Sequence, residues 1–292
     1  MDGWLLFEIT LAGVGTGGLY ALTGLAFVLI YKATRVVNIA IGEMLMMGAY
    51  FFFALSAGAG LPIWAAIPGA IAGAALLGAL VERTLIRPML GESPIASFMV
   101  TVGLASILVG AVELVWSADQ QRLPEFLPNK HIAIGEALVA PKIFYGFWVA
   151  ALLVVAVLLL FRFWRGGGAL RATASDQAAA YSVGIAVPRV HSLAWMAAAA
   201  IAAVAGIVVG SIGGISSVMG AFGLSVLVVV IFGGLDSVLG ALVGGIVVGV
   251  VEALAGFYLG GETKLLATFG LLVAILLVRP YGLFGTHEIE RL

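Results

Sequence analysis

The stretch LAWMAAAAIAAVAGIVVGSI, residues 193–212, carries no charged side chain over 20 consecutive positions. A transmembrane helix needs about 20 apolar residues to cross a hydrocarbon core about 30 Å thick. The whole 292-residue chain has this character, because 63% of its residues are hydrophobic, 10% are charged and the mean hydropathy is +1.19. Soluble domains hold about 45–50% apolar and about 25% charged residues. The sequence therefore predicts an all-α polytopic membrane protein and excludes a water-soluble globule.

Apolar stretches separated by short polar breaks follow one another along the chain. They cover residues 5–31, 40–57, 62–81, 95–116, 143–161, 193–212, 224–232, 238–259 and 265–278. The piece Leu224–Phe232 is too short to span a membrane alone, so we expect about eight to nine transmembrane helices with two broken or half-helix regions. No linker marks a domain boundary. We therefore predict a single transmembrane domain over 1–292, with a first half at 5–162, a connecting segment at 163–192 and a second half at 193–285.

The basic residues predict the orientation of these helices. Four arginines crowd the connection between the fifth and sixth stretches: Arg162, Arg165, Arg171 and Arg189. Lys and Arg near short loops remain cytoplasmic, so this connection is expected inside and the proline-containing connection 117–141 outside. The helices then alternate with the N-terminus outside and the C-terminus in the cytoplasm. A net charge of −1 provides no basic face for nucleic acid.

The 40 glycines include pairs four residues apart, such as Gly13/Gly17 and Gly245/Gly249. In lipid this spacing lets helix backbones approach closely. We expect most of these pairs to pack helices within one bundle. The alternative is a face for a second membrane subunit.

Two segments interrupt the apolar sequence and carry an acid. They are KATRVVNIAIGE at Lys32–Glu43 and GGLDS at Gly233–Ser237. Intramembrane acids usually face protein or a watery cavity, which also satisfies non-helical backbone at that depth. Paired breaks in two halves indicate an inverted repeat around a pathway, with Glu43 and Asp236 beside it. The alternative is that both acids lie at the membrane surface and cap the next helix.

The connection GGGALRATASDQAAAYSVGIAVP at Gly166–Pro188 predicts a short cytoplasmic helix. We expect its glycines to stop the preceding helix, and Ser175 to act as the N-cap of a helix over Asp176–Val183. Gly184 then ends that helix. A short capped helix with a small-residue face can lie in a groove of a partner protein. The alternative is a surface helix that only closes a loop.

Several chemical motifs are absent from the sequence. There is no G-x-x-x-x-G-K-[ST], so the chain cannot hold ATP phosphates by that loop. It also lacks H-E-x-x-H and G-x-S-x-G, and it contains no cysteine. Nothing in the sequence indicates an enzyme or a metal site.

Three motifs occur in a specific order: NIAIGE at Asn38–Glu43, RATASDQAAAYSVGI at Arg171–Ile185 and GGLDSVLGALVGG at Gly233–Gly245. With the ending PYGLFG at Pro280–Gly285, they resemble the LivH-like permease subunits of branched-chain amino acid ABC importers. The resemblance covers nearly the whole chain. Such permeases commonly carry an aromatic residue and then a His where this chain has Ile39 and Ile41. They often have Gly in place of Asp236.

The resemblance implies a non-enzymatic permease subunit in a bacterial inner membrane. Its partners would be a second homologous permease, identical or different, two cytoplasmic ATPase subunits and an extracytoplasmic substrate-binding protein. The chain itself would hold no cofactor, since ATP and Mg would be bound by the ATPases. The cargo would be a small amino-acid-like solute, such as a branched-chain amino acid or a related amide, urea or aromatic acid, moved inward by alternating access.

The resemblance also suggests which residues act. Those that would dock into the ATPases are Arg171, Ala174, Asp176, Ala179, Tyr181 and Gly184. Those that would line the translocation pathway are Asn38, Ile41, Glu43, Asp236 and Ser237. A rival hypothesis from another class is an autonomous ion-coupled secondary transporter that uses Glu43 and Asp236 for coupling.

Overall fold

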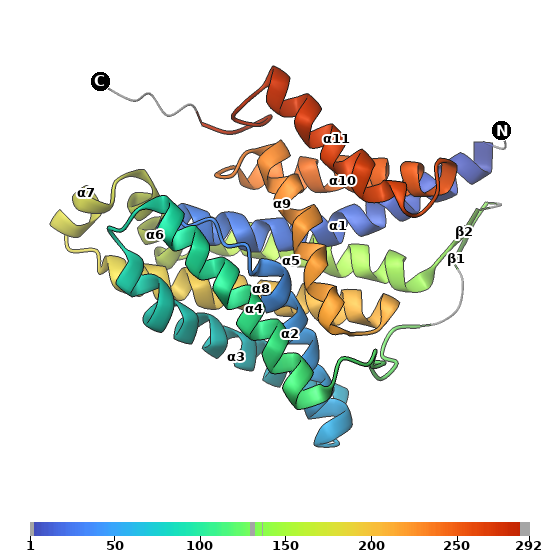
Figure 1. Ribbon diagram of the computed structural model, residues 1–292, viewed down its shortest axis with the longest axis horizontal. Helices are drawn as coiled ribbons and strands as arrows, with labels where there is room; N and C mark the ends of the chain where they lie inside the picture. The colour runs from blue at the N-terminus through green and yellow to red at the C-terminus, as the bar shows by residue number, and fades with distance from the viewer. Residues whose placement is uncertain (1–2, 129–131, 136, 287–292) are drawn as a thin grey trace.

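The computed structural model describes residues 3–128, 132–135 and 137–286, and over these it is helical apart from one short hairpin (Figure 1). The α-helices are α1 (Gly3–Thr34), α2 (Ile41–Phe53), α3 (Ile63–Val81), α4 (Pro94–Trp116), α5 (Pro141–Phe163), α6 (Arg165–Ser175), α7 (Gln177–Ser182), α8 (Val187–Gly213), α9 (Phe222–Gly233), α10 (Val238–Tyr258) and α11 (Thr263–Val278). The shorter elements are η1 (Ala54–Gly58), η2 (Glu82–Ile86), η3 (Arg87–Met89) and η4 (Ser217–Ala221), and the strands are β1 (Ile132–Ile134) and β2 (Ala137–Val139).

Seven helices of the described chain are long and apolar enough to cross a membrane: α1, α2 extended by η1, α3 extended through η3, α4, α5, α8 and α10. Two shorter apolar helices, at 217–233 and 263–278, accompany them. The prediction of a polytopic helical membrane protein is confirmed. The apolar stretch Leu224–Phe232 becomes α9, which has 12 residues and is preceded by the 3₁₀ turn η4.

The helix α1 lies at the centre of the bundle (Figure 1). Of the 18-residue apolar segment of α1, 89% is buried, whereas only 22% of the corresponding segments of α3 and α5 is buried. A helix that is apolar on all sides belongs inside a large bundle. The exposed apolar faces of α3, α4 and α5, which include Leu76, Leu114 and Leu152, suit contact with lipid.

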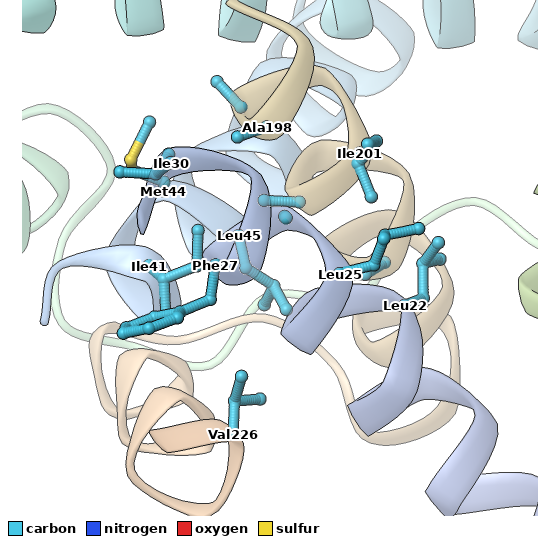
Figure 2. Packing of buried hydrophobic residues seen from close by; sticks show 14 of the residues in the cluster. Leu22, Leu25, Phe27, Ile30, Ile41, Met44, Leu45, Ala198, Ile201 and Val226 are labelled. Carbon is cyan, nitrogen blue, oxygen red and sulfur yellow. The ribbon is translucent and has the colours of Figure 1, made fainter. Parts of the chain in front are cut away.

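The core joins the two halves of the sequence. Figure 2 shows Phe27 and Ile30 of α1 close to Ile41 and Met44 of α2, with Val226 of α9 beyond them. All five side chains are at most 1% exposed. In lipid such close packing provides dispersion attraction, which replaces the hydrophobic driving force available in water.

Glycines hold α1 against α10, the pair of helices with the most extensive contact. A Cβ added to Gly17 would lie 2.7 Å from the carbonyl oxygen of Gly245, and one added to Gly249 would lie 2.5 Å from that of Gly13. No side chain fits in this space. The expectation that these glycine pairs pack helices within the bundle is confirmed for Gly13/Gly17 with Gly245/Gly249.

The two ends of the bundle carry different structures (Figure 1). The antiparallel hairpin β1–β2, in which Ile132 pairs with Val139, lies at one end, and α6 with α7 lies at the other. Near the hairpin end, Gln121 and Ile215 exchange two backbone hydrogen bonds of 2.8 Å. This bridge ties the long connection after α4 to the turn between α8 and η4.

Candidate translocation and coupling sites

The first predicted break lies inside the bundle. After α1 the chain turns back in a non-helical segment over residues 35–40 before α2 begins. Its backbone is satisfied by Thr101 of α4, whose Oγ1 accepts from Ile39 N at 3.3 Å and donates to Val37 O at 3.2 Å. Thr101 lies seven residues, or about 10 Å, into α4. Non-helical backbone at this depth is therefore paired with protein, as membrane burial requires.

Asn38 organises this break from within. Its side chain is fully buried, and Oδ1 accepts from Ala40 N at 3.1 Å while Nδ2 points to the sulfur of Met44 at 3.3 Å. Ile41 is 1% exposed and packs in the core cluster. Both residues therefore shape the start of α2 from the interior of this chain.

The start of α2 meets η4 and α9 through glycines. A Cβ on Gly42 would overlap the carbonyl oxygen of Gly220 and would lie 2.8 Å from the Cα of Gly223. The start of α2, directly after the break, therefore meets η4 and the first turn of α9. Gly220 and Gly223 were not among the predicted site residues. Their small size was the only signal in the sequence, and 40 glycines made it too common to be specific.

Glu43 lies at this junction. A Cβ on Gly220 would lie 2.8 Å from Oε1 of Glu43, and Oε2 is buried with no hydrogen-bond partner among the described residues. Glu43 is also in the first turn of α2, whose N-cap Ala40 has no side-chain hydrogen bond to offer. A carboxylate there suits the positive end of the helix dipole. The position of Glu43 is therefore consistent both with capping of α2 and with a place beside the pathway.

The second predicted break occupies a different place. Asp236 accepts hydrogen bonds from the backbone N–H of Thr286, at 3.3 Å, and from its hydroxyl. Ser237 is the N-cap of α10 and accepts from Gly240 N at 2.9 Å. The 12 residues of α9, about 18 Å, separate Asp236 from the junction at Gly220. The structure does not bring Asp236 together with Glu43.

Asp236 instead faces the connecting segment. It lines a cavity of about 380 Å³ together with Lys32, Arg35, Arg171 and Ala174. The carbonyl oxygen of Ala174 accepts from Arg35 Nη2 at 3.3 Å. Asp236 therefore lies at the end of the bundle that carries α6 and α7, beside the last turn of α1.

The predicted coupling helix is present as α7. Asp176 is its N-cap and accepts from Ala179 N at 3.0 Å, so the prediction of Ser175 as the cap is wrong. Ser175 instead ends α6, where its hydroxyl donates to Arg171 O at 3.0 Å. Gly184 closes the helix with a φ of +86°, a conformation that suits glycine.

Most residues of α7 are exposed. Tyr181 is 71% exposed and Val183 is 75% exposed, whereas Ala180 is buried against the bundle. Ala179 is exposed as well. The helix is anchored by Gln177, whose Nε2 donates to Ala33 O of α1 at 3.4 Å. It thus presents an aromatic and an aliphatic side chain away from the rest of the chain.

The preceding helix corrects a second expectation. Gly166–Gly168 do not stop a helix, because α6 runs through them from Arg165. The break falls before them, at Trp164, and Gly167 packs directly against the backbone of Phe161. Arg171 donates to the carbonyl of Phe161, which holds the corner between α5 and α6. The glycines permit a close turn back.

An ion pair between a buried carboxylate and a partly exposed arginine secures the base of α8, next to residues 163–192. Arg87 binds Glu82 through two hydrogen bonds of 2.8 and 3.1 Å, and Ser192 donates to the same carboxylate at 2.6 Å. Glu82 is fully buried. Arg87 also donates to Ser192 Oγ at 2.9 Å. This cluster fastens the end of α3 to the first turns of α8.

A second buried carboxylate was named in no site prediction. Glu252 of α10 is 7% exposed and accepts from Tyr20 of α1 at 2.5 Å, and from Ser225 of α9 and Thr268 of α11 at 3.1 Å each. Four helices therefore converge on one side chain. No group of three or more potential metal-binding side chains occurs within the described residues.

Comparison with known proteins agrees with this arrangement. The model of the family "Branched-chain amino acid transport system / permease component" matches residues 9–278. The high-affinity branched-chain amino acid transport system permease protein LivH of Salmonella typhimurium is 31% identical over 293 residues, which cover 96% of this chain and 95% of LivH. BraD of Pseudomonas aeruginosa, described in the same words, is 29% identical with the same coverage.

The fold is also found among solved structures. PsaBC from Streptococcus pneumoniae, in complex with Fab, matches with a TM-score of 0.52 and 13% identity, covering 92% of this chain and 91% of that chain. At this identity the likeness concerns the fold alone.

The fold is thus a bundle of apolar helices, seven of them candidate membrane spans within the described residues, with an interrupted, protein-paired segment inside it. The chain belongs to the family of permease components of branched-chain amino acid transport systems. It is a non-catalytic component of an ABC transport system. The family match counts against the rival hypothesis of an autonomous ion-coupled carrier that uses Glu43 and Asp236 for coupling.

Proposed function

We propose that this chain is the membrane-spanning subunit of an ATP-driven importer that moves a small amino-acid-like solute into the cytoplasm. A branched-chain amino acid, or a related amide, urea or aromatic acid, is the expected cargo. The observation that carries this proposal is α7, a capped helix that presents Tyr181 and Val183 to the outside at one end of the bundle. A helix of this kind fits a groove in a partner.

The remaining subunits follow from the same assignment. A second permease, two cytoplasmic ATPases that bind ATP and Mg, and an extracytoplasmic substrate-binding protein complete the importer in a bacterial inner membrane. The first half at 5–162 and the second half at 193–285 form an inverted repeat, and 163–192 couples them to the ATPases. The N-terminus is outside and the C-terminus cytoplasmic. Support comes from the placing of α6 and α7 at the opposite end from β1–β2 (Figure 1).

The coupling surface consists of residues of α6 and α7 and their flanks: Arg171, Ala174, Asp176, Ala179, Tyr181 and Gly184. Tyr181 is its contact residue, since it is the large exposed side chain of α7. Asp176 and Gly184 define the ends of the helix. Arg171 fixes the corner after α5. ATP-driven closure of the ATPases moves α7, which is bonded to α1 through Gln177.

The pathway passes the junction of α2 with η4 and α9. Asn38 and Ile41 are buried behind the wall of the pathway and hold the start of α2 in place. Glu43 places a polar group in the pathway. The Oε2 of Glu43, which has no partner among the described residues, supports this assignment. A buried acceptor without a partner destabilises the fold, so such a group is usually retained for a function. Asp236 and Ser237 lie at the cytoplasmic end of the pathway. Asp236 lines the cavity of about 380 Å³ that Lys32, Arg35 and Arg171 also line.

Co-purification tests the coupling assignment with matched variants. Val183 follows α7 and is 75% exposed, and Val218 lies in η4, outside the coupling surface, and is 74% exposed. Val183→Asp and Tyr181→Asp should reduce recovery of the ATPase subunits with the tagged chain, whereas Val218→Asp should not. Equal recovery of the ATPase subunits with all three variants would show that α7 does not bind them. If the wild-type chain were recovered without any ATPase and still supported uptake in ATP-free vesicles, the importer proposal would be overturned.

A further inference from the structure

A groove of about 530 Å³ lies between α5, α6 and α8, next to the coupling segment. Its volume falls within the range of about 300–1,000 Å³ that is usual for ligand pockets. The walls are almost entirely apolar, with Leu160 from α5, Leu170 from α6 and Ala197 from α8. No part of the described chain fills it. None of the coupling or pathway residues above lines it.

The groove has the length of one leaflet of a membrane. The face of α8 that lines it extends from Arg189 to Ala200, a separation of 11 residues and thus about 16 Å. Half of a hydrocarbon core is about 15 Å. The groove therefore starts at the end of the bundle that bears α7 and reaches close to the bilayer midplane.

The groove is open toward lipid. Leu160 and Leu193, on its two sides, are 53% and 45% exposed, and α5 as a whole shows most of its surface to the outside. In a membrane an apolar opening of this kind faces acyl chains. A protein helix in the same place would need small residues on both sides for close packing, whereas the wall of α5 consists of large side chains such as Leu160 and Phe161.

One charge lies at the mouth. Arg189 is the single charged side chain among the described residues that line the groove, and it is exposed and makes no hydrogen bond or ion pair with them. Trp164 lines the same end and is 46% exposed. Tryptophan is favoured at the membrane interface, and basic pockets between transmembrane helices on the cytoplasmic side bind anionic headgroups.

We propose that this groove binds an anionic phospholipid of the cytoplasmic leaflet, with one acyl chain along α8 and the phosphate against Arg189. The headgroup accepts hydrogen bonds from the guanidinium, and the chain covers the apolar walls. The bound lipid joins α5, α6 and the start of α8, which together hold α7. This site lies beyond the transport function proposed above, and its assignment to the cytoplasmic leaflet rests on the orientation proposed there.

Native mass spectrometry tests the site on the full chain, purified with the subunits that accompany it. The complex should retain phosphatidylglycerol in preference to phosphatidylcholine. Arg189→Gln should lower the affinity for phosphatidylglycerol by about fivefold, as expected for one basic residue near an anionic surface. Arg83→Gln, which removes an exposed arginine outside the groove, is the matched control and should leave the affinity unchanged.

Blocking the groove provides a second variant. Ala197→Phe fills the space along α8 and should abolish lipid retention, whereas Ala72→Phe on the exposed face of α3 should not. Both variants should keep the thermal stability of the folded chain, measured in the same detergent. Retention of phosphatidylglycerol by both Arg189→Gln and Ala197→Phe at wild-type levels, or equal retention of phosphatidylcholine, overturns the proposal.

A protein occupant would be detected separately. The chain contains no cysteine, so Leu193→Cys introduces a unique thiol at the groove. Modification by a membrane-permeant maleimide that phosphatidylglycerol slows would support the lipid. Efficient disulfide dimers of the Leu193→Cys chain in native membranes would place a second copy in the groove and overturn the lipid assignment.

Discussion

The hydroxyl of Tyr20 in α1 donates a 2.5 Å hydrogen bond to the carboxylate of Glu252 in α10, 232 residues later in the chain. Ser225 and Thr268 donate to the other carboxylate oxygen. Three hydroxyl groups from three helices thus satisfy one buried acid. In an apolar bundle such polar contacts specify which helix faces meet, while dispersion contacts act less selectively.

Removal of this carboxylate should loosen the bundle. Glu252→Leu leaves three buried hydroxyls without their acceptor and should lower the melting temperature in detergent more than Glu252→Gln, which keeps one acceptor oxygen. Each interhelical hydrogen bond contributes about 0.6 kcal/mol, up to about 1.7 kcal/mol. A double-mutant cycle with Tyr20→Phe measures the coupling. Additive effects of the two substitutions would show that the pair does not stabilise the fold.

Glycine at the junction should be irreplaceable. Gly42→Ala places a Cβ 2.8 Å from the Cα of Gly223, where two backbones touch, so α2 must move away from α9. We expect a loss of uptake and a lower yield of folded protein. Gly103→Ala on α4 is the control, because nothing lies within 4 Å of a Cβ there. Similar behaviour of the two variants would argue against tight packing at the junction.

Glu43→Gln should change uptake without preventing assembly. The substitution retains the size of the side chain but replaces the carboxyl group, whose Oε2 is buried with no partner among the described residues, by an amide. Initial uptake rates across solute concentrations measure the effect, and Glu113→Gln, at an exposed position on α4, is the control. Normal kinetics in the Glu43 variant would assign this residue to helix capping alone.

The ion pair at the base of α8 should stabilise the fold by avoiding an unpaired charge. Arg87→Gln leaves the fully buried carboxylate of Glu82 without its cation and should lower the stability, by less than the about 3–5 kcal/mol of a fully buried pair, because Arg87 is 37% exposed and Ser192 still donates to Glu82. The double variant Glu82→Gln/Arg87→Gln should recover part of this loss. Thermal unfolding in detergent measures both, with Arg83→Gln as the control. A double variant as unstable as the single one would contradict this account.

The N-cap of α7 should affect partner binding. Asp176→Lys removes the acceptor for Ala179 N and places a cation at a helix N-terminus, with an expected cost of about 1 kcal/mol to the helix. Binding of the ATPase subunits should weaken. Asp176→Ser retains a capping oxygen and should bind nearly normally. Equal weakening in both variants would point to the carboxylate itself as a contact.

Local sequence was sufficient for much of the coupling segment. A short helix over Asp176–Val183 was predicted, and α7 spans Gln177–Ser182. The cap was assigned one residue early because Ser175 and Asp176 are both good N-cap residues, and only the path of α6 decides between them. Gly166–Gly168 were misinterpreted for a related reason. Their role is the close approach of Gly167 to Phe161, a contact that a run of glycines does not reveal.

The candidate translocation site was harder to predict from the sequence. The break before Glu43 was predicted, since it interrupts an apolar run with polar residues. The segment that meets the start of α2 in space, η4 with the first turn of α9, contains no charge and resembles the small-residue sequence around it. Asp236 attracted attention because it is an acid in an apolar region. The structure places it with Thr286 at one end of the bundle, about 18 Å along α9.

The sequence by itself determined that the chain is a membrane bundle and where its short exposed helix lies, whereas the described chain has seven long apolar helices and two shorter ones where eight to nine spans were expected. These features depend on hydrophobicity and capping over neighbouring residues, so they are local. The tertiary structure decided which helix ends meet at Gly42 and Gly223, and which hydroxyls satisfy Glu252. In lipid, apolar helices of similar composition have no hydrophobic preference among neighbours. The choice rests on glycine contacts and a few hydrogen bonds between residues far apart in the chain.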